Sequence, residues 1–352
     1  MDASLKSHIM KKRLLPLFMA GAVLSASAVD TEKSSDLLHL DAEARVDYEY
    51  FRTDGRTNTA ESGFKGKYLA LRADGTIIPG LTYSWRQRLN KMHRDQSFFD
   101  ATDWIYLNYA VDRWNFQVGK EVVAMGGWEY NRAPVDIMCG SIFWHNIPCY
   151  DLGVSVSYDP APADRITFQV VQSPFFTSEN RNMFGYNLMW DGRHGIFHAL
   201  WSANMIEYHP GRYISYIVLG NKFTFDKVEI ELDLMNRAAS RQTYFFKDCS
   251  LMGEVAWRPT ERWRVYGKAS YDMNHTDTDA DLTVFSGTEI TVAGGGVEFF
   301  PLLKQGHSLR LHAGCFYAWG TNTNPADVLQ DKTLMITTGI TWKMNFFNLK
   351  KH

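Results

Sequence analysis

Apolar and polar residues alternate in about sixteen short runs between His39 and Phe347. In the first run, residues 40–50, every even position is apolar and every odd position is charged. A period of two residues is typical of a β-strand with two different faces. The apolar faces either pack in a protein core or meet lipid around a watery lumen. The second arrangement is a transmembrane β-barrel, the all-β fold class that we predict from the features below.

The N-terminus has the layout of an export signal. Residues 11–13 are basic, residues 14–24 are apolar but too few to span a bilayer, and residues 26–28 are small. An ordinary N-terminal helix would not need these three regions in this order. We therefore predict a signal peptide over residues 1–28, cleaved after Ala28, and one barrel domain over residues 29–352.

Composition excludes other classes of protein. The chain has no apolar run of about 18 residues, so we expect no membrane-spanning helix. Aromatic residues make up 14% of the chain, which aromatic girdles at two membrane interfaces would explain. Without residues 1–28 the chain holds 33 Lys and Arg against 38 Asp and Glu, so it carries no footprint for nucleic acid.

The connections between the runs are sorted by length. Even-numbered connections, such as residues 74–80 and 159–164, are short and rich in Asp, Gly and Pro. Odd-numbered ones, such as residues 53–62, 120–149 and 274–288, are longer on the whole. Short turns at one end and long loops at the other are typical of outer-membrane barrels, whereas a soluble propeller or sandwich has no reason for this sorting. We predict about 16 antiparallel strands in the bacterial outer membrane, with both termini periplasmic.

The last run also indicates an outer-membrane protein. Thr338, Ile340, Trp342, Met344 and Phe346 alternate with smaller or more polar residues. This pattern resembles the C-terminal strand by which the barrel-assembly machinery recognises its substrates. The expected partners are therefore that machinery and outer-membrane lipid.

Parity assigns the two faces of the strands. We expect Val118, Val154, Leu232 and Val255 to face lipid. A barrel of about 16 strands leaves an aqueous channel, and solvated charges can line it without the cost of burial. The predicted lumen-facing residues are Asp41, Glu43, Arg45, Asp47, Glu49, Ser84, Arg86, Arg88, Asn115, Gln117, Glu229, Glu231, Asp233, Arg264, Lys268, Arg310 and His312.

The segment of residues 121–149 breaks the alternating pattern. It is the longest connection, yet it holds too many apolar residues for a solvated loop. Its position resembles that of the third loop of sixteen-stranded porins, which folds into the lumen. We predict that Gly126-Gly127 bends the chain and that Trp128, Tyr130 and Ile137 pack on the inner wall. The charges of Glu121, Glu129, Arg132 and Asp136 would then lie near the narrowest point.

Residues 117–130, followed by Pro134, resemble a strand-to-loop stretch of the phosphate-selective porin O/P-like family of Bacteroidetes-type porins. Residues 64–69 and 79–90 resemble neighbouring stretches of the same family. The resemblance implies a sixteen-stranded, trimeric diffusion channel. Its anion-selective members line the lumen with a ladder of Arg and Lys, which this chain matches only in part, because acidic residues lie beside its basic ones.

One hypothesis for selectivity is a transverse electric field. Five basic residues on the first three predicted strands would form one wall of the constriction, and Glu129 and Asp136 of the folded-in segment would lie opposite. The alternative is that the arginines pair with Asp47 and Glu49 on their own wall. The five basic residues are Arg45, Lys65, Lys67, Arg86 and Arg88.

The four cysteines give weaker indications. Cys139 and Cys149 could form a disulfide at the end of the folded-in segment, whereas Cys249 and Cys315 lie on strands too far apart to pair. We expect the latter two to be free and lipid-facing. No Cys or His spacing resembles a metal site, so no metal or other cofactor is expected.

The pattern favours a porin, a water-filled channel for passive diffusion of small hydrophilic solutes and ions. Two alternatives remain open. One is a substrate-specific channel for an anion or an oligosaccharide, which aromatic residues in a row along the lumen would favour. The other is an outer-membrane barrel hydrolase, although no nucleophile motif stands out.

Overall fold

The computed structural model describes residues 36–91, 98–146, 149–242, 245–277, 284–304 and 307–350, so the predicted signal peptide lies outside the described residues. Three short helical elements lie between the sixth and seventh strands: α1 (Trp128–Asn131), η1 (Pro134–Asp136) and α2 (Ile142–Asn146). The strands are β1 (Asp36–Thr53), β2 (Arg56–Thr57), β3 (Gly63–Ile78), β4 (Leu81–Arg88), β5 (Thr102–Val111), β6 (Trp114–Val122), β7 (Tyr150–Ala161), β8 (Asp164–Gln172), β9 (Phe184–His194), β10 (Phe197–His209), β11 (Arg212–Phe225), β12 (Val228–Ala239), β13 (Asp248–Thr260), β14 (Trp263–Asn274), β15 (Glu289–Lys304), β16 (His307–Thr321) and β17 (Thr333–Lys350).

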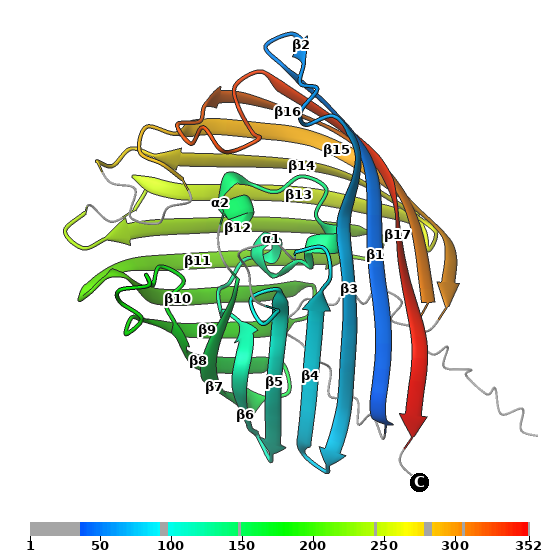
Figure 1. Cartoon of the computed structure of the whole chain (residues 1–352), viewed down its shortest axis with the longest axis vertical. Helices are drawn as coiled ribbons and strands as arrows, with labels where there is room; N and C mark the ends of the chain where they lie inside the picture. The colour runs from blue at the N-terminus through cyan, green and yellow to red at the C-terminus, as the bar shows by residue number, and fades with distance from the viewer. Residues whose placement is uncertain are drawn as a thin grey trace, which may run out of the picture.

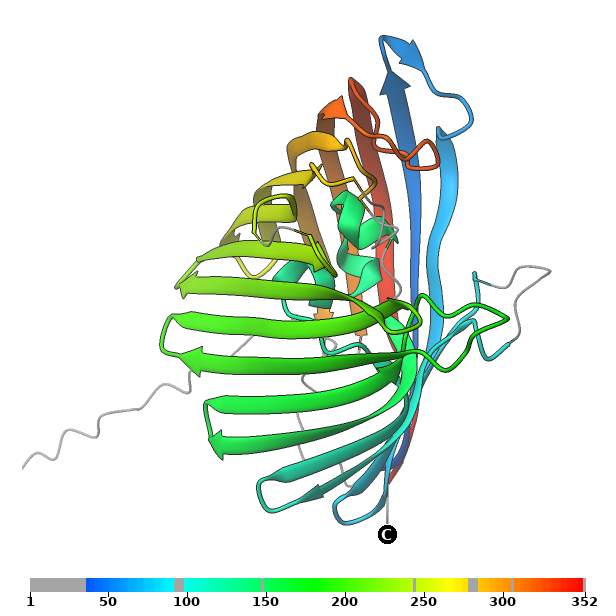
Figure 2. The same ribbon diagram turned by 90° about the vertical axis from the view of Figure 1, so that its left-hand side faces the viewer.

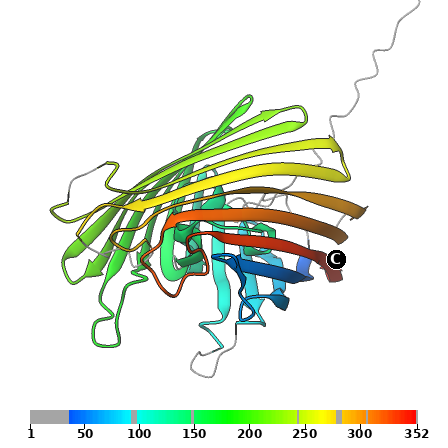
Figure 3. The same cartoon turned by 90° about the horizontal axis from the view of Figure 1, so that it is seen from above.

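The strands form one closed antiparallel sheet (Figure 1). Each long strand pairs with its neighbours in sequence, and β1 pairs with β17 to close the barrel. The two-residue β2 only folds back on the end of β1, so β1 pairs directly with β3. The other sixteen strands correspond to the predicted ones, and the predicted fold class is confirmed. Seen from above, the ribbons surround the folded-in helical segment (Figure 3).

The turns at the end of the barrel with the short connections are shorter than the sequence indicated. Only residues 79–80, 112–113, 162–163, 195–196, 226–227 and 261–262 separate the strands there. The predicted turn of residues 74–80 is wrong, because β3 continues to Ile78, where Thr76 pairs with Thr82 and Ile78 with Leu81. The turn then closes at Gly80, whose φ of 84° is costly for a residue with a Cβ.

The alternation of faces follows the prediction. Val118, Val154 and Val255 are between 51% and 53% exposed, while inward neighbours such as Gln169 and Glu254 are buried. An apolar outer band and a polar interior are what a barrel in lipid requires. Within the described residues, no helix is both long enough and apolar enough to cross a membrane.

The cysteines differ in part from expectation. All four are free, so the Cys139–Cys149 disulfide is not formed, and burial raises the pKa of the Cys139 thiol to about 12. Cys315 is exposed as predicted. Cys249, the second residue of β13, is buried rather than lipid-facing. The backbone N–H of Phe246, just before β13, donates at 2.7 Å to Asn236, which lies directly opposite Cys249, and strand parity does not register such a loop contact.

We expect a charged substitution to destabilise the barrel far more on its outer face than on its inner face. Val154→Arg, on the outer face of β7, should cost about 2–4 kcal/mol of folding free energy in a bilayer. Ser155→Arg is the matched control, because Ser155 faces inward and its hydroxyl donates to Glu121 at 2.9 Å. Denaturant unfolding of lipid-reconstituted protein measures both. Equal costs at the two positions would contradict the assignment of faces.

Candidate functional site

The described residues 123–146 of the folded-in segment lie inside the barrel (Figures 1 and 2). After β6 the chain turns inward, and α1 and α2 lie between the two walls in both side views (Figures 1 and 2). Trp128, Tyr130 and Ile137 are at most 7% exposed. The ring centroid of Tyr130 lies 6.3 Å from that of Phe143, which in turn lies 6.2 Å from that of Tyr216 on β11. The segment therefore joins the inner wall in one apolar cluster.

Two glycines let the segment approach the wall closely. A Cβ at Gly126 would lie 2.5 Å from the carbonyl oxygen of Leu200 on β10, and one at Gly220 on β11 would lie 2.8 Å from the Cα of Gly127. Real Cβ atoms do not tolerate such distances. Gly127 also has a φ of 92°, so it supplies the predicted bend.

The start of the segment is bound by uncharged side chains of β8 and β10. The backbone N–H of Ala124 donates to Gln169 at 2.7 Å, and its carbonyl accepts from the Asn204 amide at 2.8 Å. The N–H of Gly126 donates to the Ser202 hydroxyl at 2.8 Å. These bonds satisfy backbone groups that would otherwise be buried without partners.

Glu129 is the acidic anchor of the segment. Its carboxylate accepts hydrogen bonds from Lys268 of β14 and from the N–H and hydroxyl of Ser141, at 2.9 and 2.6 Å from the latter. Its backbone N–H donates to Asp233 at 2.8 Å. Burial alone would raise the pKa of Glu129, but Lys268, assisted by Ser141, holds that pKa below its ordinary value of 4.5.

Arg132 is the first basic anchor. Its guanidinium forms ion pairs with Glu231 of β12 and, at 2.7 Å, with Glu254 of β13. Glu231 also forms an ion pair with Lys222 at 2.7 Å, and Glu254 also forms one with Arg264. Neighbouring charges of alternate sign thus compensate one another across four strands, β11 to β14.

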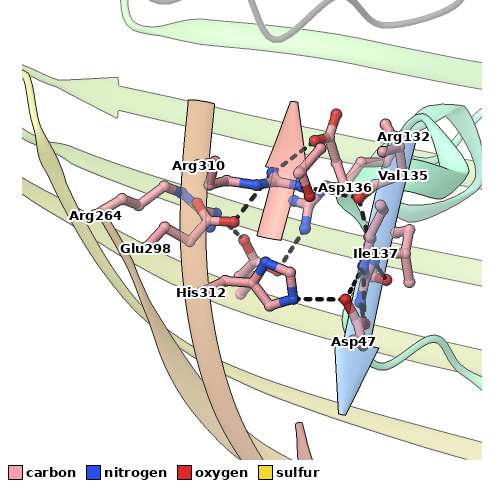
Figure 4. A network of polar contacts seen from close by, with 12 residues as sticks. Asp47, Arg132, Val135, Asp136, Ile137, Arg264, Glu298, Arg310 and His312 are labelled. Carbon is pink, nitrogen blue, oxygen red and sulfur yellow. Dashed lines mark hydrogen bonds and ion pairs between the residues drawn. The ribbon is translucent and has the colours of Figure 1, made fainter. Parts of the chain in front are cut away.

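Arg45 and Arg310 bind the centre of the segment from the other side, and Figure 4 shows Arg310 beside Asp136. Arg45 of β1 donates to the carbonyls of Val135 and Ile137 at 3.1 and 2.6 Å. Arg310 of β16 donates to the Val135 carbonyl at 2.8 Å and pairs with Asp136 at 2.6 Å. Both guanidinium groups therefore serve backbone carbonyls as well as carboxylates.

Asp47 completes this network. It accepts from Arg45 Nε at 2.9 Å. It also contacts His312 Nε2 at 3.0 Å (Figure 4). A Cβ at Gly339 would lie 2.3 Å from the Asp47 carboxylate, so glycine there leaves room for the pair. Arg45 therefore pairs with Asp47, as the alternative to the field hypothesis expects.

The other predicted basic residues are paired as well. Arg86 lies 2.9 Å and Arg88 lies 3.8 Å from Asp103 of β5. Lys65 and Lys67 lie 3.1 and 2.8 Å from Glu49. Arg86 and Arg88 thus find their carboxylate on β5 rather than on β1.

The structure brings together only some of the predicted site residues. Arg45 and Asp136 meet around η1, whereas Glu129 pairs with Lys268 rather than with the basic residues of β1, β3 and β4. Sequence reasoning placed Lys268 and Arg310 in the lumen by parity but gave no partner for either. It also missed Gln169 and Asn204, because a neutral amide in a strand carries no signal for a docked loop.

A cavity of about 390 Å³ remains beside the segment, on the side of β3 to β9. On the side of the segment, the cavity is lined by Val122 at the end of β6 and by Val123, Ala124 and Asn131. The largest group among the other lining side chains is uncharged and polar: Thr76, Thr82, Ser84, Asn108, Asn115, Gln117, Ser155, Ser157, Thr167 and Gln169. Five lining residues are charged: Arg72, Asp74, Glu121, Arg165 and Asp191. Trp104 and Tyr106 add aromatic surface. The wall beside the cavity is thus mainly uncharged, whereas the wall that the segment covers is rich in ion pairs.

Residues 38–248 match the family described as phosphate-selective porin O and P. An anion-selective porin from Comamonas acidovorans shares the fold, with a TM-score of 0.61 and 10% identity over 88% of this chain and 99% of the other. OmpT of Vibrio cholerae gives a TM-score of 0.59 and 13% identity over 87% and 97%. A trimer form of that OmpT gives 0.57 and 14% over 88% and 100%. A comparison with curated protein sequences finds no match.

These findings define a porin fold, and the family match covers more than half of the chain. The chain belongs to the family of phosphate-selective porins O and P. It is a porin of the bacterial outer membrane, a channel for passive diffusion.

We expect Lys268→Met to loosen the folded-in segment. Removing one partner leaves the Glu129 carboxylate buried without its cation, which costs about 3–5 kcal/mol for a buried pair. Single-channel recordings should show higher open-channel noise. The double variant Glu129→Gln with Lys268→Met is the control, because it removes both charges and should recover most of the quiet wild-type trace. Equal noise in the single and double variants would contradict this account.

The depressed pKa of Glu129 predicts an acid-dependent change. Ionised Glu129 stabilises the docked segment at every pH above about 4.5, and this contribution is lost as the pH falls through the lower folded value. Open-channel noise should therefore stay constant from neutral pH to about 4.5 and rise only in stronger acid. Glu129→Gln should lack this rise, and a wild-type rise between pH 7 and 5 would argue against the assignment.

Proposed function

We propose that the mature chain is a general diffusion pore whose width is set by the segment of residues 123–149. The observation that carries this proposal is that the segment is bound at four places on the inner wall, through Ala124, Glu129, Arg132 and Asp136. A loop fixed by buried hydrogen bonds and ion pairs is a permanent constriction rather than a mobile lid.

We further propose that ion selectivity is weak. Every predicted basic site residue pairs with a carboxylate at 4 Å or less. An anion-selective pore needs fixed positive charge that its own wall does not neutralise. This pairing supports the general pore over the phosphate-specific alternative.

The remaining proposals concern activity and assembly. Family membership supports a channel rather than a hydrolase. A trimer form among proteins of this fold supports a homotrimer. The exposed aromatic rings of Phe346 and Phe347 near the end of β17 support recognition by the assembly machinery.

The test is planar-bilayer recording with purified, heat-modifiable protein. Wild-type protein should give stable ion conductance. Folded protein that conducts no ions would contradict the proposal. Deleting residues 124–136 should raise single-channel conductance, because the lumen then loses its constriction. An unchanged conductance would mean that the segment does not restrict the pore.

A matched pair of glycine variants tests the constriction without a deletion. Gly126→Ala should raise conductance, because its Cβ would lie 2.5 Å from the Leu200 carbonyl oxygen and displace the segment. Gly66→Ala should leave conductance unchanged, because a Cβ there meets nothing within 4 Å.

A further inference from the structure

The neutral wall of the lumen is built in register across consecutive strands. Asn108 of β5 lies directly opposite Gln117 of β6, which lies opposite Ser155 of β7, which lies opposite Gln169 of β8. We call these four residues the neutral belt. In a sheet, side chains opposite one another share a face and lie about 5 Å apart. The belt is therefore one continuous strip of hydrogen-bonding groups at one level of the lumen. Gln169 is buried and already bonds the backbone of Val122 and Ala124, so Asn108, Gln117 and Ser155 are its solute-facing members.

A second row runs parallel to the belt, toward the periplasm. Asn115 of β6, Ser157 of β7 and Thr167 of β8 are also in register, and all three line the cavity. Ser157 and Thr167 bond to each other at 2.8 Å, while the Asn115 side chain forms no hydrogen bond with another described residue. Amides and hydroxyls both donate and accept, so this wall can exchange hydrogen bonds with water or with a hydroxylated solute.

The charges bordering the cavity are compensated. Arg72 pairs with Asp74 at 2.6 Å, and Arg165 pairs with Asp159 at 2.7 Å. Asp191 lies 2.6 Å from His198. An anion that entered would shed water without meeting an uncompensated cation, and such transfer is costly.

Glu121 is the one acidic group built into the belt itself. Its carboxylate accepts from Gln117 at 2.5 Å and from Ser155 at 2.9 Å, and no cation forms an ion pair with it in the part of the chain that the structure describes. The Glu121 side chain is itself only 1% exposed, so it holds Gln117 and Ser155 in place rather than contacting a solute, and it adds no positive charge to this wall.

Aromatic surface borders the same space. Trp104 and Tyr106 both face inward from β5, and Trp104 donates to Ser84 at 2.7 Å. Arg86 covers the Trp104 ring at 3.6 Å, which leaves the half-buried Tyr106 as the more open ring. An aromatic face beside hydrogen-bonding groups suits a ligand with apolar C–H faces and polar edges.

We propose that this cavity binds and passes uncharged polyhydroxylated solutes, of which neutral sugars are the chemical class, in preference to phosphate. The inference rests on the proposed channel function and adds the solute class to it. The neutral belt and the second row bind the hydroxyl groups of such a solute, and Tyr106 packs against its C–H groups. The basic residues that border the cavity are paired with carboxylates, so they offer an anion no free positive charge.

Current block by maltose and by inorganic phosphate in planar bilayers tests the solute class. Maltose should reduce the wild-type conductance in a saturable way, and phosphate at equal concentration should not. Saturable block by phosphate alone, or by neither solute, would overturn the inference while leaving the channel function intact. A protein that conducts no ions would instead refute the proposed function, so the two failures are distinguishable.

Two variants locate the binding site. Tyr106→Ala should weaken maltose block about threefold to tenfold, the value of a lost aromatic contact. Tyr109→Ala is the control, because Tyr109 lies on the same strand but faces outward at 45% exposure. Equal effects of these two variants would contradict the site.

Asn108→Asp keeps the proposal testable if Tyr106→Ala fails to fold, because it changes charge at constant shape. It should weaken maltose block and shift the reversal potential toward cations under a salt gradient. If neither quantity changes, the neutral belt does not line the conduction path and the proposal fails. Heat-modifiable migration should be the same for all folded variants.

Discussion

The pairing of β1 with β17 is the constraint on which the rest of the structure depends. Hydrocarbon offers no hydrogen bonds, so a sheet in a membrane is stable only if its last strand satisfies its first. Here the two strands pair from Asp36 with Lys350 to Thr53 with Thr333. A closed ring of sixteen long strands encloses more space than the side chains of its own wall can fill. The folded-in segment and the lumen charges are both consequences of that space.

The lumen arginines act as structural donors. Carbonyl groups of the folded-in segment lie away from bulk water and need hydrogen bonds, which Arg45 and Arg310 supply to Val135 and Ile137. Their own charges need compensation, which Asp47, Asp136 and Glu298 provide. The free-energy cost of leaving one of these buried groups without its partner exceeds the free energy that the intact pair contributes to folding. This asymmetry explains why acidic and basic residues alternate on neighbouring strands, and it weakens the case for a transverse field.

The sequence predicted the parts of the fold that depend on local periodicity. Strand number, the direction of each face and the length sorting of the connections follow from the two-residue period and from turn residues. The predictions that were wrong or incomplete concern residues whose environment depends on contacts with other parts of the fold. The pairing of Thr76 with Thr82 lengthened β3, and the position of Cys249 beside a loop hid an outward residue. Likewise Lys268 was placed in the lumen by parity, but its pairing with Glu129 depends on how a distant segment folds back.

The same segment also decides which chemistry a solute meets. It lies against the charged wall of β11 to β16, where each ion pair is closed at short range and its field falls off faster than that of a single charge. It leaves open the cavity lined by β3 to β9, where Asn, Gln, Ser and Thr are the commonest kind of side chain. A count of lumen arginines therefore misjudges this pore, because most of them lie beneath or beside the segment with carboxylate partners. Selectivity depends on the residues that the segment leaves in contact with open space, and in this chain those residues are mainly neutral.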